Sequence, residues 1–291
     1  MDRPVTESIT AQRTLEGAGF PVRRPFPTAE AAQVDPFLLL DEMGPVDWKP
    51  GEAVLAPDHP HRGFETVTYV LAGRMAHKDS AGHAGTLGPG DVQWMTAGDG
   101  VIHSELYEES FRKSGGRAHG FQLWVNLPAR DKRMAPRYQE IPAARIPVAH
   151  SPDGRATARV IAGEALGARA VIDTRTPIAV VHWTLAPGAA VVQAAPPEHA
   201  AGVYVFGGTA RVGAGATPVP DGTFAVLGDG DAVPLAVPAD ARAPAEILFL
   251  SGVHLREPMA RYGPFVMNTA AEIREAIEDF NRGRLGKRER A

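Results

Sequence analysis

Short apolar segments alternate with closely spaced turns along most of the chain. Pieces rich in valine, threonine and aromatic residues lie between glycine- or proline-containing turns, at Glu65–Leu71, Val92–Met95, Val101–Glu105 and Gly120–Val125. A second block has the same character, at Ala179–Leu185, Gly202–Phe206, Arg211–Val212, Thr223–Leu227 and Glu246–Ser251. Side chains of this kind suit the half-buried surface of a sheet. Their spacing predicts an all-β protein built as a sandwich or barrel.

One helix is predicted, over Ala270–Arg282. Thr269 fits the N-cap position, Glu272 fits the capping-box position, and apolar residues follow at helical spacing. The two strand-rich blocks are separated by Leu127–Val148, a stretch with several prolines and arginines. We interpret that stretch as a linker or extended crossover with solvated charges.

Two pairs of similar short sequences suggest an internal duplication. Tyr69–Gly73 resembles Tyr204–Gly208, and Leu87–Asp91 resembles Leu227–Asp231. A chain of 291 residues has room for two domains at roughly 150 residues each. We therefore expect tandem β-domains at residues 1–140 and 141–291, the second ending in the helix.

Composition narrows the class of protein. The 31 glycines and 26 prolines fit an architecture with many turns. The chain has no cysteine, which excludes disulfides, thiolate metal sites and cysteine nucleophiles. A formal net charge of −4 argues against a general nucleic-acid binder. We find no targeting segment and no apolar run of membrane-spanning length, and expect a cytoplasmic protein without a membrane partner.

Two short motifs carry the candidate chemistry. His59 and His61 are spaced by two residues, and so are His103 and Glu105. Side chains at this spacing share one face of a strand. Two such strands side by side in a barrel would present three imidazoles and one carboxylate to a single cation. These ligands suit Fe(II), Mn(II), Ni(II), Cu(II) or Zn(II).

Spacing alone does not decide which carboxylate is the fourth metal ligand. Glu65 has the strand parity of His59 and His61, so it can replace Glu105, unless a bulge at Gly63 breaks that parity. The remaining histidines are less promising as ligands, and we expect His77 and His83 at the surface of a hairpin connection.

Longer strings in the chain resemble the pirin family of the cupin superfamily. The resemblance spans nearly the whole chain and rests on DPFLLLDE (35–42), HPHRGFETVTYVLAG (59–73), GPGDVQWMTAGDGVIHSE (88–105), GFQLWVNLP (120–128) and GPFVMNTAAEI (263–273). It implies two tandem cupin barrels, the first of which binds one metal ion. The implied metal ligands are His59, His61, His103 and Glu105.

The resemblance also implies which metal is bound and which barrel binds it. The implied metal is usually iron, as Fe(II), and nickel, manganese, copper, cobalt or zinc can take such sites. In the second block, a rough alignment puts Ala194, Pro196, Ala243 and Ala245 at the four ligand positions. None of these side chains can bind a metal, so we expect the second barrel to be metal-free.

The activity implied by the resemblance is that of a quercetin 2,3-dioxygenase. Its partners would be an aromatic substrate and dioxygen, and its product would include carbon monoxide. Glu105 would serve as both metal ligand and proton acceptor, or Glu65 would assist it. The alternative is a non-enzymatic regulator that binds a partner protein in a metal- or redox-dependent way. A discriminating feature is an open, substrate-sized cavity over the metal. We expect a monomer.

Overall fold

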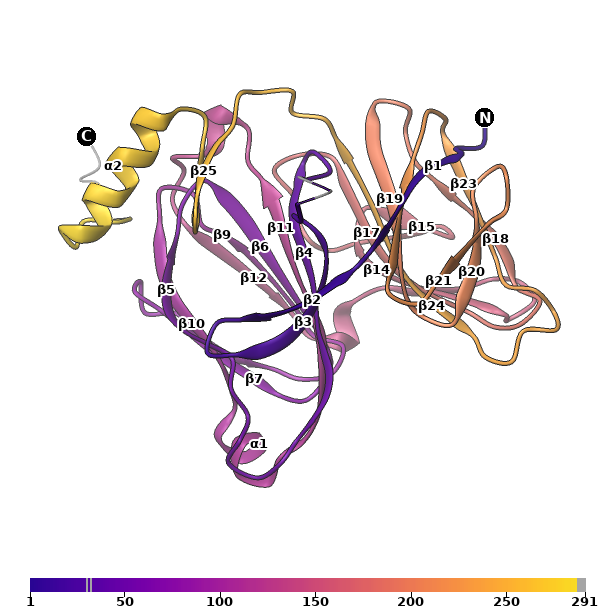
Figure 1. The fold of residues 1–291 in the computed structure, drawn as a ribbon, viewed down its shortest axis with the longest axis horizontal. Helices are drawn as coiled ribbons and strands as arrows, with labels where there is room; N and C mark the ends of the chain where they lie inside the picture. Colours follow the sequence, from indigo (N-terminus) through magenta and orange to yellow (C-terminus); the bar gives the residue numbers. More distant parts are fainter. Residues whose placement is uncertain (30, 32, 287–291) are drawn as a thin grey trace. The chain divides into compact units, whose positions relative to one another are not determined.

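The chain is mostly β-strand and divides into two compact units (Figure 1). The computed structural model describes residues 1–29, 31 and 33–286. Unit 1 comprises residues 1–12, 25–36 and 144–254, and unit 2 comprises residues 13–24, 37–143 and 255–291. The crossover at 143–144 lies close to the expected boundary at 140–141. The two ends of the chain do not follow the predicted division at one boundary. The first strand belongs to unit 1, and the C-terminal helix belongs to unit 2.

Unit 2 contains a seven-stranded and a four-stranded antiparallel sheet and a small hairpin. The larger sheet has the order β12 (Arg137–Ile141), β9 (Val92–Thr96), β6 (Phe64–Ala72), β11 (Gly116–Asn126), β4 (Phe37–Trp48), β3 (Phe20–Phe26), β2 (Gln12–Glu16). The smaller sheet has the order β5 (Ala56–His61), β10 (Val101–Tyr107), β7 (Met75–Asp79), β8 (Ala84–Leu87). The hairpin pairs β25 (Ala260–Tyr262) with β26 (Phe265–Met267). Unit 2 also contains the short helices α1 (Glu109–Ser114) and η1 (Ala129–Asp131). The short helix η2 (Ala143–Arg145) lies at the boundary between the two units.

Unit 1 repeats this plan. Its larger sheet has the order β1 (Val5–Thr10), β22 (Thr223–Leu227), β19 (His199–Gly207), β24 (Ala245–Val253), β17 (Ile178–Leu185), β14 (Ala156–Ala162), β13 (Val148–His150). Its smaller sheet has the order β18 (Ala190–Ala194), β23 (Ala232–Ala236), β20 (Thr209–Val212), β21 (Thr217–Pro220). A short ribbon pairs β15 (Glu164–Ala165) with β16 (Ala168–Arg169). Aliphatic and aromatic side chains from both sheets fill its core, including Trp183 and Phe249 of the larger sheet and Val191 and Leu235 of the smaller one.

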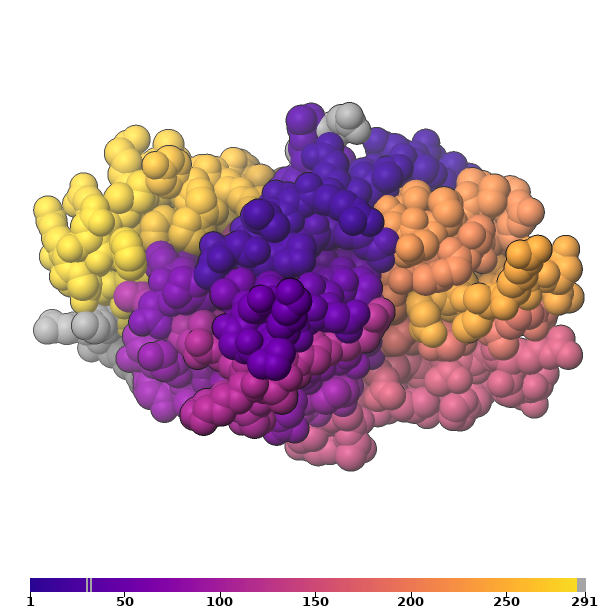
Figure 2. All heavy atoms as spheres, turned by 60° about the horizontal axis from the view of Figure 1, so that its bottom comes forward, coloured from indigo at the N-terminus to yellow at the C-terminus, as the bar shows by residue number. Residues whose placement is uncertain are grey.

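The predicted helix is α2 (Ala270–Asn281), and it belongs to unit 2. Thr269 caps it, and its side chain and that of Glu272 form the expected capping box. Ile273 and Ala276 pack with Phe265 and Met267 of the hairpin. In the space-filling view the yellow C-terminal residues lie against the violet strands of the same unit (Figure 2). No helix in the described part of the chain is both long and apolar enough to cross a bilayer.

Most of the stretch expected to be a linker, residues 127–143, is ordered within unit 2, and its last residues belong to unit 1. Arg137–Ile141 forms β12 and pairs with β9 at the sheet edge. Lys132 is 1% exposed, and Arg133 forms ion pairs with Asp99 and Glu275. The prediction of solvated connector charge was therefore wrong for these two residues, because their cations have acceptors inside the unit.

The two repeated sequence pairs differ in structural meaning. Tyr69 lies on β6 and Tyr204 on β19, which hold the same position in the two larger sheets. Leu87 ends β8 of a four-stranded sheet, whereas Leu227 ends β22 of a seven-stranded sheet. Only the first pair marks equivalent positions. In the sheet order of unit 1, the strand equivalent to β10, which carries His103, is β23, and it does not contain Ala243 or Ala245.

Candidate metal centre

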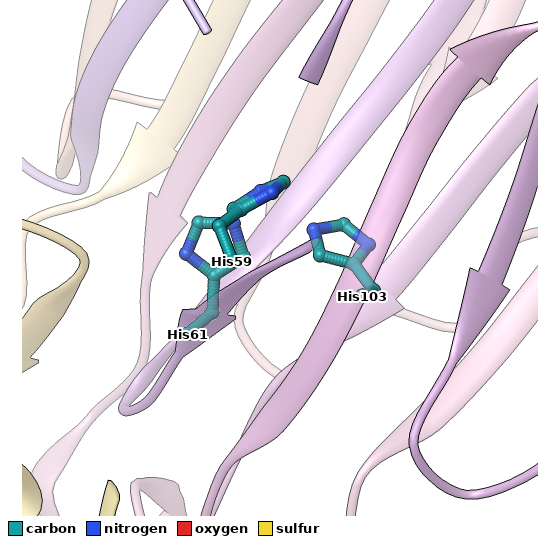
Figure 3. Close-up of side chains that lie close together, drawn as sticks. All are labelled: His59, His61 and His103. Carbon is teal, nitrogen blue, oxygen red and sulfur yellow. The ribbon is translucent and has the colours of Figure 1, made fainter. Parts of the chain in front are cut away.

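Two neighbouring strands of the smaller sheet in unit 2 bring three histidines together. The antiparallel register pairs His103 of β10 with His59 of β5, and Val101 with His61. The ring centroids of His59 lie 4.6 Å from His61 and 4.5 Å from His103, and His61 lies 5.0 Å from His103. Figure 3 shows the three imidazoles facing a common space. One ligand nitrogen from each lies within 4.8 Å of the others.

Each of the three imidazoles has a ring nitrogen without a hydrogen-bond partner among the described residues, as a metal ligand requires. Nδ1 of His61 and both ring nitrogens of His103 are buried and have no hydrogen-bond partner among the described residues. Buried polar atoms in this state are costly unless another ligand satisfies them. Nδ1 of His59 lies 2.7 Å from the carbonyl of Pro57, which leaves Nε2 as the free nitrogen. A divalent cation among the three rings would satisfy these atoms.

Electrostatics keep two of these rings neutral. Burial, reinforced by the neighbouring histidines, lowers the pKa of His61 well below its ordinary value. Burial also lowers the pKa of His103 to about 4, although the carboxylate of Glu105 opposes that shift. A neutral imidazole offers a lone pair and a protonated one does not. The site is therefore ready for a metal at neutral pH.

Glu105 lies on the same strand but outside the cluster of converging ligand atoms. Its Oε1 accepts a 2.7 Å hydrogen bond from the hydroxyl of Thr68, and its Oε2 lies 3.5 Å from Nε2 of Gln122. The carboxylate is 7% exposed and borders the same cavity as His59 and His61. The structure thus brings the three histidines together and holds the carboxylate beside them.

Glu65 lies on the other face of its strand. The chain breaks its alternation between β5 and β6 at Gly63, which has a φ of +88°. Thr68 faces Glu105 as a result, whereas Glu65 accepts a 2.6 Å hydrogen bond from Thr96 and does not border the cavity. A glycine is needed here because most other residues avoid positive φ.

A cavity of about 430 Å³ opens over the histidines within unit 2. Its wall near the metal site includes Gln122 and Trp124 of β11. The ring of Trp124 lies 5.2 Å from that of His61 and 4.4 Å from that of Phe64. The volume falls within the range of ordinary small-molecule sites. An open cavity of this size is the feature named above as discriminating between a dioxygenase and a non-enzymatic regulator.

Several cavity residues were missed by sequence reasoning. Trp124 lies in a quoted motif but was not assigned a role, and Arg24, Asp41 and Arg261 come from segments far from the histidines along the chain. His77 was expected at the surface, but it is 5% exposed, because β7 pairs with β10 and turns this side chain inward. No local signal marks such residues, since strand pairing over long separations positions them.

The equivalent strands of unit 1 have no such side chains. There β18 has the sequence AVVQA and β23 has AVPLA, with Val191, Gln193, Val233 and Leu235 buried. Among the described residues of the whole chain, the three histidines of unit 2 are the one group of three or more potential metal ligands that converges. The donor set of that group fits a divalent transition metal.

Comparison with known proteins gives consistent matches along the whole chain. The family model described as Pirin matches residues 19–125, and the Pirin C-terminal cupin domain matches residues 180–286. Human Pirin is 43% identical over 287 residues, which cover 98% of this chain and 94% of that protein. A pirin-like protein of Caulobacter vibrioides is 42% identical, with 97% and 99% covered. The crystal structure of a quercetin 2,3-dioxygenase from Acinetobacter baumannii is 39% identical and matches with a TM-score of 0.91, with 98% and 99% covered. The two expected cupin barrels are thereby confirmed.

Proposed function

Because the chain belongs to the pirin family, we propose that it is a mononuclear metal enzyme that cleaves flavonols such as quercetin with dioxygen. The reaction is a 2,3-cleavage that releases carbon monoxide. The observation that carries the proposal is a set of three converging imidazoles below a cavity that can hold a flat aromatic molecule. Two of them, His61 and His103, are buried and neutral and have unsatisfied ring nitrogens. The Acinetobacter structure of the same fold, which is named for this activity, adds support.

The ligands in this proposal are His59, His61, His103 and Glu105. Fe(II) is the proposed ion, with nickel, manganese, copper, cobalt or zinc as replacements. Such an ion would act as a Lewis acid that lowers the pKa of a bound substrate hydroxyl. Hydrogen bonds to Thr68 and Gln122 set the direction of the Glu105 carboxylate. Partners of this kind tune both ligand orientation and metal affinity.

Glu105 is also the group proposed to accept the substrate proton. It borders the cavity and lies within hydrogen-bond reach of two polar side chains, so its oxygens are positioned rather than free to rotate. A general base must approach the proton it removes to hydrogen-bond distance. Trp124 offers an aromatic surface beside His61, against which the flat rings of a flavonol can pack.

Oxygen consumption by iron-loaded protein tests the proposal. The protein is loaded with Fe(II) under anaerobic conditions, mixed with quercetin and exposed to air, while dioxygen uptake and carbon monoxide are measured. We expect turnover in the wild type, a metal content below a tenth of one ion per chain in H103A, and no turnover there. H83A is the matched control, because His83 is an exposed histidine of the same unit.

The variant Glu105→Gln separates the two roles of that residue. It keeps the size of the side chain and its acceptor for Thr68, but it cannot hold a proton as a carboxylate does. We expect it to retain part of its iron and to lose at least about a hundredfold in kcat, the usual scale of a general base. No turnover in wild-type protein that holds one iron per chain would reject the dioxygenase proposal and favour the regulatory alternative.

A further inference from the structure

The cavity wall of unit 2 contains two arginines in different electrostatic states. Arg24 donates from Nε and Nη2 to the two oxygens of Asp41, at 2.7 and 2.6 Å. Its Nη2 also lies 2.6 Å from Oε1 of Glu16. Two carboxylates therefore occupy this guanidinium, and it has little capacity left for a ligand.

Arg261 of β25 is the other arginine, and its charge is not paired in this way. Its Nη1 donates to the carbonyl of Leu38 at 3.3 Å, and its guanidinium carbon lies 5.1 Å from the centre of the Trp124 ring. Among the described residues, no carboxylate lies within ion-pair distance of it. Its side chain is half-buried and borders the cavity. An arginine has five N–H donors, so most of its donors here lack a protein partner.

Glu16 and Asp41 lie close enough to influence Arg261 but are held by Arg24. Burial lowers the pKa of Arg261 and so does the charge of Arg24, while Asp41 and Glu16 oppose that change. The group stays cationic at any physiological pH, because a guanidinium is not deprotonated in proteins. With both nearby carboxylates bound to Arg24, the unpaired donors of Arg261 are left for a ligand.

Trp124 connects this guanidinium with the metal centre. One side of the ring approaches His61 at 5.2 Å between centroids, and Arg261 lies over the ring at 5.1 Å. A flat ligand that packs on Trp124 and presents one oxygen to the histidines therefore has another part beside Arg261. Arginine binds carboxylates through two parallel hydrogen bonds, which fixes orientation as well as adding affinity.

We propose that the natural substrate is an aromatic or enolic acid, with its metal-binding oxygen at one end and a carboxylate bound by Arg261 at the other. This inference rests on the proposed function for the end that meets the metal. It goes further by assigning Arg261 as the residue that determines specificity. The natural substrate then differs from neutral quercetin in carrying a carboxylate.

Binding of matched probe pairs to nickel-loaded protein, kept anaerobic to prevent turnover, tests the assignment. The first pair is 3-hydroxyflavone and its 4′-carboxylate, and the second is 3-hydroxy-4-pyranone and its 6-carboxylate. The pairs share a chelating group but place the carboxylate at different distances from it. Affinities are measured by titration calorimetry. We expect the acid of at least one pair to bind about tenfold more tightly than its neutral partner, the scale of one charge-assisted hydrogen-bonded contact.

Variants assign that preference to Arg261. In Arg261→Met and Arg261→Gln, the ratio of the affinities for the acid and for its neutral partner should fall to about one. Nickel content equal to that of the wild type shows that the metal site is intact. Arg117→Gln is the control, because Arg117 is an exposed arginine of unit 2 outside the cavity wall.

Two results would overturn the proposal: no preference for the acid in either pair, or a preference that survives in both Arg261 variants. The outcome is independent of the dioxygenase assay. A clear charge preference in protein that never consumes dioxygen with quercetin would reject the proposed reaction while upholding the acid site. Turnover of quercetin without any charge preference would do the opposite.

Discussion

Lys132 is a buried cation surrounded by oxygen acceptors. Its Nζ donates to the carbonyls of Gly63 and Val266, at 2.8 and 3.1 Å, and to Oδ1 of Asn126 at 2.5 Å. Burial still lowers its pKa from 10.5 to about 8. Between these two values the unfolded chain binds more protons than the folded one, so the free energy of unfolding rises with pH. The contribution is complete above pH 10.5 and is lost as the pH falls through 8.

Comparison with Lys132→Met isolates that contribution. From pH 8 to pH 10.5 the wild type should gain about 3 kcal/mol of unfolding free energy relative to the variant. Other groups that titrate in this range are common to both proteins and cancel. Urea unfolding at the two pH values measures the difference, and a constant difference would show that Lys132 keeps an ordinary pKa in the folded state.

Thr68 contacts the proposed metal ligand Glu105 through its hydroxyl, which also lies 2.7 Å from Oε1 of Gln122. The variant Thr68→Val keeps the shape of the side chain and removes the hydroxyl that donates to the carboxylate. We expect metal affinity to fall by about tenfold to a hundredfold, as for other partners of ligating groups. Thr66→Val is the matched control, since Thr66 is a buried threonine two residues away on the same strand. Equal affinities in competition with a chelator would contradict this role for Thr68.

Gly63 lies between β5 and β6, where the chain also pairs with the hairpin of β25 and β26. The backbone N–H of the preceding Arg62 donates to the carbonyl of Pro264 at 3.3 Å, and the Arg62 carbonyl accepts from the N–H of Val266 at 3.0 Å. The carbonyl of Gly63 accepts from Nζ of Lys132. A Cβ at position 63 would lie 2.0 Å from the carbonyl oxygen of Val266. The turn between β5 and β6 therefore has to be a glycine for steric reasons as well as for its positive φ.

The comparison of Gly63→Ala with Gly51→Ala separates these reasons. Gly51 has a φ of +83°, close to the +88° of Gly63, but open space lies around its would-be Cβ. Both variants should lose about 1 kcal/mol from the unfavourable φ. Gly63→Ala should lose about 2 kcal/mol more from steric overlap and should bind metal more weakly. Chemical denaturation measures the difference, and equal losses would mean that the hairpin moves away at no cost.

Much of this site could be predicted from local sequence, and the limits have physical reasons. The two-residue spacing in β5 and β10 fixes which side chains share a face, so His59, His61 and His103 were predictable as a group. The parity of Glu65 was not, because it depends on the backbone angle at Gly63. Burial of Lys132 and the position of Arg261 depend on contacts with segments more than a hundred residues away. No local pattern contains that information.

At the scale of the whole molecule, the metal should affect one unit. All the candidate ligands lie in unit 2, and β18 and β23 of unit 1 offer no histidine or carboxylate. A metal at a hundred times its dissociation constant stabilises the folded state that binds it by about 2.7 kcal/mol. We expect it to slow hydrogen exchange in β6 and β11, and to leave β19 and β24 unchanged. Equal protection of both pairs of strands would show that the units unfold together.

Unit 2 is discontinuous along the chain, and this has a consequence for biosynthesis. The ribosome makes all three histidines before any of β14 to β24, and it makes Arg261 and Pro264 after them. A nascent chain that ends before residue 255 already has the imidazoles but lacks the last segment of the cavity wall. The barrel with the candidate metal centre can therefore be completed only after translation has passed through most of the other barrel, although its histidines are made before residues 144–254 of that barrel.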